Sequence, residues 1–323
     1  MLDFKKNLFC VALFIFCFPV KSMAVVRQAV TYNLSPGRFG DNLLTYMHAK
    51  WISYKHKLPL LYKPFLYSNK LILHQSEPLY VKSVINTFSK TVVLGSKNSV
   101  NQHESSSILY VVPYFPESKW ELKNCKNFQK RPWDSFEIDW NDKGFIEELR
   151  KMIAPIEAIP LLNLPADRIT VAVHVRRGGN YDNQGTFEGA PLKFLSDDFF
   201  IKEIRQLYYF LGEKPLYVHL FTDDLNPVKI MNTFKNNLKG LDIQFNCREE
   251  DNSDTKHVIE DFFAMQQFDC LIHSESNFSF TMSKIGNYMV SLFPDSFYKK
   301  GSEIIYDHVN MSTNYDHLGF KII

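Results

Sequence analysis

The sequence predicts an α/β fold in which mainly parallel strands alternate with helices. One observation is the run at 169–175, rich in β-branched residues and typical of a strand buried on both faces. A second is a strand, glycine loop and helix unit over 28–57. A third is the regular alternation of strand and helix patterns over 196–289. We therefore expect doubly wound parallel sheets covered by helices.

Two domains are expected from the length of the chain and its proline positions. The chain has 323 residues, of which 45% are hydrophobic and 15% aromatic, enough for two ordinary cores. Pro155, Pro160 and Pro165 interrupt the pattern in a way typical of a connection between domains. The prediction is two Rossmann-like domains, at 25–160 and 161–323.

The strand at 169–175 ends in charged residues. His174 is followed by Arg176 and Arg177 and then by a Gly-Gly pair. Ligands of open α/β sheets bind beyond the carboxyl ends of the strands, where a histidine and two arginines can meet an anion. On this segment alone, a charged and solvated strand end is an equally good explanation.

The N-terminal unit begins with a strand at 28–33, followed by a glycine loop at 35–40. A helix begins at Asp41, and a further short strand is expected at 59–62. Two glycines before a helix are more often plain turn chemistry than a phosphate cradle. The loop by itself therefore assigns no function.

The remaining elements differ in how clearly the sequence signals them. Between 76 and 142 the patterns give strands at 91–94 and 108–112, in an order that the sequence does not reveal, and a helix follows at 144–153. The second half is clearer. There we expect helices at 196–210, 226–238, 257–268 and 278–289, and strands at 216–221, 241–245 and 270–272.

The first 24 residues have the pattern of a signal peptide. Lys5 and Lys6 precede an apolar run at 8–20, and small residues stand at Ser22 and Ala24, where a signal peptidase cleaves. The run is shorter than the ~20 residues that span a bilayer, so a membrane tether is the lesser alternative. We expect the secretory route, to an ER or Golgi lumen, a periplasm or the exterior, with peripheral membrane association left open.

Composition argues against nucleic acid and against metal ions as partners of this protein. The net charge is +2 and the charges are interspersed, so the basic patch of a nucleic-acid binder is missing. Beyond the signal, Cys125, Cys247 and Cys270 allow at most one disulfide, and neither its pairing nor the oligomeric state can be read from the sequence. Their spacing matches no zinc pattern, and we expect no metal site.

Four predicted strand ends carry polar residues: 37–40, 174–177, 223–224 and 274–277. A small polar turn that opens a helix, as at Ser276, offers N–H groups and the positive helix end to a phosphate, and arginine adds bidentate contacts. Asp261 supplies a carboxylate, the group that accepts from the N1–H and amino groups of guanine. Together these features indicate a nucleoside diphosphate bound between the two domains.

In these motifs the sequence resembles the fucosyltransferases of GT-B fold, most of all the α1,2 family and also the α1,6 and protein O-fucosyltransferases. The α1,2 family carries His-x-Arg-Arg at the end of a buried strand, as at 174–177, and a Phe-Ser-Asp-Asp-like segment, as at 221–224. The family ends in a pattern of Asp, Met, and Cys or Asp, followed by Ser-Asn-Ser-x-Phe-Ser. The similar residues of this chain are Asp261, Met265, Asp269 and Cys270, followed by 274–279. The loop at 37–40 is similar to the Gly-Arg-Phe-Gly-Asn-Gln of the O-fucosyltransferases.

The resemblance implies an inverting, metal-independent transfer of L-fucose from GDP-β-L-fucose to a glycan hydroxyl, with an α1,2 linkage as the first expectation. It implies that Arg176 contacts the β-phosphate as a catalytic group and that Arg177 also binds the donor. It implies further that His174 and Asp261 hold the guanosine. The other donor-binding residues that it implies are Ser276, Asn277 and Phe278, largely through backbone, and Gly37, Arg38, Phe39 and Gly40, which would close over the donor from the acceptor-side, N-terminal domain.

The chain departs from the family at several positions. Gly179 stands where the family has Asp, Asp41 and Asn42 replace Asn-Gln, and Glu275 replaces an Asn. These departures leave two alternatives open. One is a GT-B transferase for another nucleotide sugar, and the other is a non-catalytic module that binds a nucleotide sugar or a glycan.

Asp41 is the first candidate for the catalytic base, because it places a carboxylate next to the glycine loop on the acceptor side. The alternative is that Asp41 only caps the helix that begins there. Asp182 and Glu188, in the loop after the central strand, are the other candidates for the base.

Overall fold

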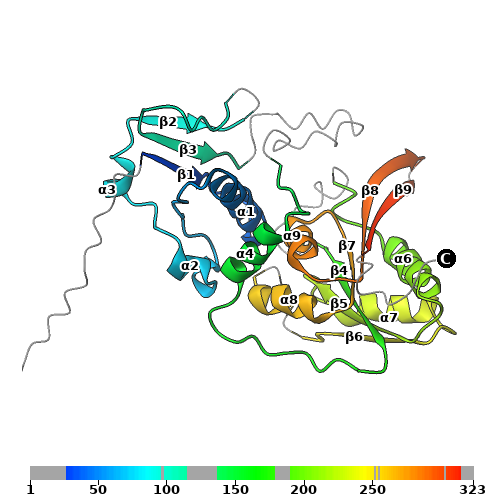
Figure 1. Cartoon of the computed structure of the whole chain (residues 1–323). Coiled ribbons are helices and arrows are strands. Elements are labelled where there is room, and N and C mark those ends of the chain that lie inside the picture. The colour runs from blue at the N-terminus through cyan, green and yellow to red at the C-terminus, as the bar shows by residue number, and fades with distance from the viewer. Residues whose placement is uncertain are drawn as a thin grey trace, which may run out of the picture.

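The computed structural model describes residues 27–95, 98–114, 137–178, 190–250, 252–253, 255–301 and 303–313. It confirms the α/β class: the strands form two sheets whose neighbouring strands are parallel except at one edge (Figure 1). The predicted signal peptide at 1–24 lies outside the described residues, as does Cys125. No described helix is long and apolar enough to cross a membrane.

The first sheet has the strand order β1-β3-β2 and is formed by β1 (Gln28–Tyr32), β2 (Lys90–Val93) and β3 (Ile108–Val112). Strands β1 and β3 are buried throughout, and helix α1 (Phe39–His56) packs on both. The strand expected at 59–62 is only a pair of isolated bridges, because Pro59 and Pro64 remove ladder donors. Short helical segments and one longer helix follow: η1 (Ser68–Lys70), α2 (Leu73–Ser76), α3 (Lys82–Ile85) and α4 (Lys143–Ile153).

The second sheet has the order β6-β5-β4-β7-β8-β9. Its strands are β4 (Ile169–Val175), β5 (Leu216–Thr222), β6 (Ile243–Cys247), β7 (Cys270–His273), β8 (Val290–Lys300) and β9 (Glu303–Thr313). The connecting helices are α6 (Asp197–Phe210), α7 (Pro227–Asn237), α8 (Val258–Ala264) with η4 (Met265–Gln267), and α9 (Asn277–Ile285). The strands and helices predicted over 169–285 are confirmed to within a few residues.

The end of the second sheet differs from the prediction. Helix α9 ends at Ile285 rather than 289, because Gly286 follows with extended backbone. Beyond it, β8 and β9 form an antiparallel hairpin where no strand was predicted. A register shift next to Pro294 disturbs the two-residue alternation that marks a strand, which explains why the sequence pattern did not reveal it.

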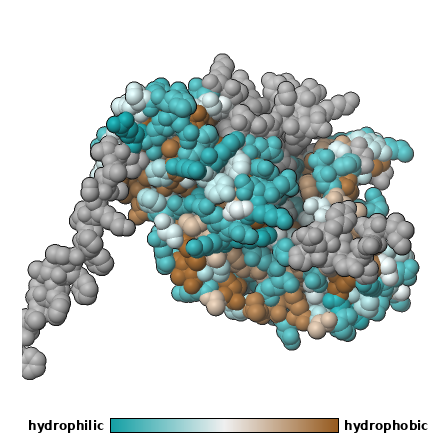
Figure 2. All heavy atoms as spheres, in the orientation of Figure 1, coloured by the Kyte–Doolittle hydropathy of each residue, from teal (hydrophilic) through white to brown (hydrophobic). Residues whose placement is uncertain are grey.

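The two faces of the second sheet belong to different cores. Val171, Val173 and Val175 of β4 pack with α6 and α7, in one apolar cluster. Ala172, on the opposite face, shares a second cluster with α8 and α9 and also with α1 and α4 of the N-terminal half. Helices α8 and α9 therefore lie between the second sheet and α1, as Figure 1 shows. Hydrophilic residues cover most of the face seen in Figure 2.

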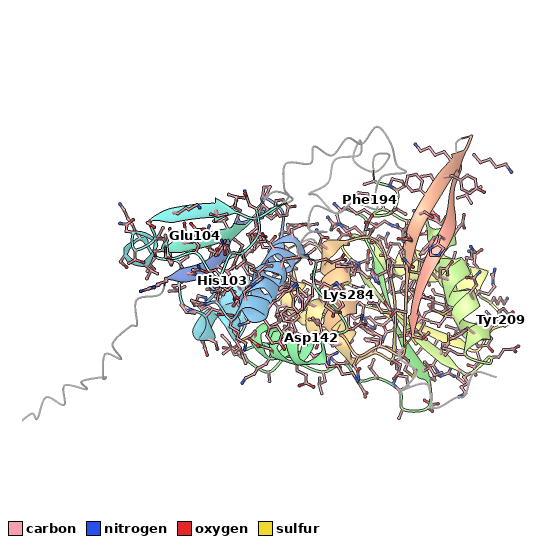
Figure 3. The ribbon with its side chains drawn as sticks, turned by 45° about the horizontal axis from the view of Figure 1, so that its top comes forward. His103, Glu104, Asp142, Phe194, Tyr209 and Lys284 are labelled. Carbon is pink, nitrogen blue, oxygen red and sulfur yellow. The ribbon has the colours of Figure 1, made fainter. Side chains whose placement is uncertain are left out.

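Helix α9 is held at both ends by the N-terminal half. At its carboxyl end, Arg150 of α4 donates through Nε to the carbonyl of Ile285 at 2.7 Å. In Figure 3, Lys284 of α9 and Asp142, the N-cap of α4, mark this region. At its amino end, Gly40 of α1 lies so close that a Cβ there would stand 2.5 Å from the backbone nitrogen of Phe278. The division at residue 160 and a donor cleft between two domains stay predictions.

We expect Gly40→Ala to destabilise the protein, because a methyl group at this position meets the backbone of α9, which cannot rotate away. Overpacking of this kind costs about 1–3 kcal/mol. The measurement is urea unfolding of the variant. Gly95→Ala is the matched control, since among the described residues, chain neighbours apart, no atom lies within 4 Å of its added Cβ. Equal unfolding midpoints for the two variants would contradict the close contact.

Candidate functional site

Three of the predicted polar strand ends lie side by side. Strand β4 stands between β5 and β7, with His174 opposite Phe221 on one side and His273 on the other. All three strands run in the same direction, so their carboxyl ends share one edge of the sheet. The segments beginning at Arg176, Asp223 and Ser274 therefore converge there.

Both arginines of the His-x-Arg-Arg motif are paired with carboxylates. The guanidinium of Arg176 is buried and forms an ion pair with buried Asp223. Asp223 also accepts from the backbone N–H of Arg177 at 2.6 Å. The Arg177 side chain pairs with Asp197 of α6 and donates to the carbonyl of Leu195 at 2.6 Å. Arg176 thus has a fixed position at the edge, and Arg177 is directed back toward α6.

The amino end of α9 lies at the same edge. Ser276 is its N-cap residue, but its side chain makes no capping hydrogen bond. The first N–H groups of a helix have no partner within the helix, so they are the donors that this end of α9 offers to an anion. The ring of Phe278 packs against His174 with centroids 5.5 Å apart. This contact joins the end of β4 to the start of α9.

The glycine loop is ordered by Asn42, a residue to which the sequence prediction gave no role. Its Oδ1 accepts from the N–H of Ser35 at 2.8 Å, and its Nδ2 donates to the carbonyls of Gly37 and Arg38, each at 3.1 Å. The helix begins at Phe39, two residues earlier than predicted, with Arg38 as N-cap. Phe39 is buried against Phe262 and Phe278.

Each carboxylate oxygen of Asp41 accepts a hydrogen bond. Oδ2 accepts from the backbone N–H of Arg38 at 3.1 Å, which is a capping bond within α1. Oδ1 accepts from Nδ2 of Asn277 in α9 at 2.6 Å. Asp41 therefore lies between the amino ends of the two helices. Its role as a catalytic base stays a prediction.

Asp261 lies in the first turn of α8 and forms an ion pair with Arg248, with 2.7 Å between Nη2 and Oδ1. Burial raises the pKa of the Asp261 carboxyl, and the hydrogen bond and charge of Arg248 oppose that shift. The next residue, Phe262, packs on Phe278 with centroids 5.4 Å apart. A row of rings thus links the Asp261 pair to the amino end of α9.

Three buried histidines lie on the face of the second sheet that α8 and α9 cover. Burial lowers the pKa of His174 and of His219 to about 4, and that of His273 to about 3. His273 donates from Nδ1 to the carbonyl of Ser274 at 2.8 Å. Its Nε2 and the Nδ1 atoms of His174 and His219 have no hydrogen-bond partner among the described residues. All three are neutral at physiological pH.

Other predicted residues fall outside this geometry. Gly179, Asp182 and Glu188 lie outside the described residues, so the other candidates for the base are not placed. Cys247 and Cys270 are both buried free thiols. Within the described ranges, no group of three or more metal-ligating side chains could hold an ion.

Comparisons with known proteins give structural neighbours only. No protein-family model matches the chain, and no curated protein matches it. POFUT1 in complex with GDP-fucose is 12% identical over 83% of this chain and 97% of that chain, with a TM-score of 0.42. A mutant of Arabidopsis thaliana FUT1 in complex with GDP is 11% identical over 81% of this chain and 70% of that chain, with a TM-score of 0.48.

A third neighbour is NodZ alpha-1,6-fucosyltransferase soaked with GDP-fucose. It is 11% identical over 89% of this chain and 99% of that chain, with a TM-score of 0.44. These neighbours are named as fucosyltransferases or as proteins that hold GDP or GDP-fucose. At such identities and TM-scores the likeness assigns no function to this chain.

We expect acid to destabilise the protein through these histidines. For His174 and His219, the pKa in the folded protein is below the unfolded value of about 6.5. The stability that each neutral side chain contributes is therefore fully present above pH 6.5 and is lost as pH falls toward 4. For His219, the loss between pH 7 and pH 5 is about 2 kcal/mol, given a folded pKa of about 4. Urea unfolding at the two pH values measures it.

The control variant is His219→Phe. The ring of His219 packs against Phe221 and Phe268, so phenylalanine fits the surroundings and removes the titrating group. Its stability should fall less between pH 7 and pH 5 than that of the wild type. An identical pH dependence in the two proteins would show that His219 titrates normally.

Proposed function

We propose that this protein transfers L-fucose from GDP-β-L-fucose to a hydroxyl group of a glycan, by an inverting and metal-independent reaction. The observation that carries the proposal is the convergence of Arg176, His174 and the amino end of α9 at one sheet edge, beside the glycine loop. These are the segments whose sequence resembles the GT-B fucosyltransferases. A GT-B arrangement and an α1,2 linkage are part of the proposal.

The chemistry follows from where charge develops. As the bond between fucose and GDP breaks, the sugar gains oxocarbenium character and negative charge accumulates on the leaving diphosphate. The Arg176 guanidinium and the first N–H groups of α9 are preorganised donors for that charge. Asp223 holds the guanidinium in place through the buried ion pair, so little reorganisation is needed as charge develops.

We expect Arg176→Ala to lower turnover of GDP-fucose by roughly 10²- to 10³-fold, the usual cost of one preorganised donor. The measurement is release of GDP with and without glycan acceptors. Because the variant removes the cation that pairs with the buried Asp223 carboxylate, the double variant Arg176→Ala with Asp223→Ala is the control. It should regain stability but not turnover. Turnover within a few-fold of the wild type in either variant would contradict the role of Arg176.

Binding separates this proposal from its alternatives. Calorimetry with GDP, UDP and GDP-fucose should show the tightest binding for the guanine nucleotides. Tighter binding of UDP would favour a transferase for another nucleotide sugar. GDP binding without turnover in any acceptor screen would favour a non-catalytic module.

We also propose Asp41 as the base that takes the proton of the acceptor hydroxyl. In this role its Oδ1 would exchange the hydrogen bond from Asn277 for one from the acceptor, while Oδ2 keeps the cap. Asp41→Asn should then lower turnover by roughly 10²- to 10⁴-fold. GDP affinity should stay nearly unchanged. The melting temperature should fall only modestly, since Asn still offers one oxygen to the Arg38 N–H but lacks the charge between the two helix ends. Turnover within about threefold of wild type would leave Asp41 as a cap only.

A further inference from the structure

Arg248 and Asp261 form a partly exposed ion pair at the edge that carries the candidate site. Arg248 directly follows β6, and Asp261 lies in the first turn of α8. The side chains of Arg248 and Asp261 retain 32% and 17% of their exposure. Oδ1 of Asp261 is itself buried, so a ligand would approach the pair from its exposed side. The pairing directs donor N–H groups and acceptor carboxylate oxygens to neighbouring positions.

This order of donor and acceptor groups matches one edge of guanine. Along that edge guanine presents O6, an acceptor, followed by two donors, N1–H and the N2 amino group. A guanidinium can donate to O6 while the adjacent carboxylate accepts from the two donors. Asp261 by itself accepts from N1–H of guanine but equally from N3–H of uracil, so it does not define the base.

We propose that Arg248 is a specificity-determining residue that completes a guanine-reading pair with Asp261. The inference rests on the proposed use of a GDP-sugar and names the side chain that would select its base. Arg248 also opposes the effect of burial on Asp261, and the carboxylate must be ionised to accept both guanine donors.

The placement of the pair suits a nucleoside diphosphate. Arg248 follows β6, and α9 follows β7, three strand intervals away in the order β6-β5-β4-β7. At the usual strand spacing these intervals span roughly 14 Å, the scale of an extended nucleoside diphosphate. The base would thus lie at Arg248 and Asp261 while the phosphates reach Arg176 and the amino end of α9.

The pair makes a graded prediction for four nucleotides. GDP satisfies all three positions, and IDP lacks the amino group but keeps O6 and N1–H. UDP offers O4 and N3–H in the first two positions but places the acceptor O2 where guanine has its amino group. ADP places the amino donor where guanine has O6 and the acceptor N1 where guanine has N1–H. The expected order of affinity is therefore GDP, IDP, UDP and ADP, with roughly 10-fold or more between GDP and IDP for one lost charge-assisted hydrogen bond.

The test is calorimetry of these four nucleotides with the wild type, Arg248→Met and Arg248→Lys. Arg248→Met should weaken GDP binding roughly 10- to 100-fold and leave ADP binding nearly unchanged, so that the preference for GDP over ADP contracts. Arg248→Lys keeps the charge and should keep part of the preference. Thermal melting of each variant accompanies the titrations and separates a loss of base recognition from a loss of folding.

Arg168→Met is the matched control. Arg168 pairs with Asp242 at the same distance of 2.7 Å, but these residues precede β4 and β6 and so lie at the opposite edge of the sheet. The variant should bind all four nucleotides within about threefold of the wild type.

The outcomes separate the inference from the proposed function. A wild type that binds none of the four nucleotides overturns both. A wild type that prefers GDP, with the same preference in Arg248→Met, overturns only the role of Arg248. An equal loss of affinity for all four nucleotides in Arg248→Met also overturns that role, because base recognition would change their ratios.

Discussion

The close contact between the amino ends of α1 and α9 is the constraint on which the site depends. Gly40 allows the two backbones to meet, and Asn277 donates to Asp41 across the same contact. Two positive helix ends at this separation repel each other, and a carboxylate between them offsets that repulsion. The contact places the glycine loop beside α9, and at the other end of the helix Arg150 of α4 donates to the carbonyl of Ile285.

The sheet edge adds a second constraint, which concerns charge. A buried arginine is costly unless it is paired, and Asp223 supplies the pair for Arg176. The pair neutralises part of the charge that a diphosphate would meet. The amino end of α9 is a second source of positive potential at this edge. Neutral histidines beneath the edge add no charge of their own.

The sequence predicted the second half of the fold well, because local sequence patterns identify its helices and strands. The helices predicted at 196–210 and 226–238 begin at Ser196 and Asn226, which are the N-caps of α6 and α7, and the valines of β4 mark a strand buried on both faces. The hairpin at β8 and β9 was missed because a register shift near Pro294 hides its alternation. The start of α1 was placed late because Arg38 is an unusual N-cap.

The site was only partly predictable for a different reason. Motif residues such as His174 and Arg176 could be located because each follows or ends a strong strand pattern. The partners of site residues could not be located in this way. Asn277 lies 236 positions from Asp41, and no local sequence pattern predicts a contact between residues so far apart. The sequence analysis gave Arg248 no role, because the strand before it was predicted to end at 245, whereas β6 continues to Cys247.

The most direct test of the central claim is a crystal structure of the protein with GDP. The account predicts the diphosphate at the amino end of α9 within hydrogen-bonding distance of Arg176, with guanine against Asp261. A diphosphate bound away from the carboxyl edge of β4 and β7, or a guanine remote from α8, would contradict it.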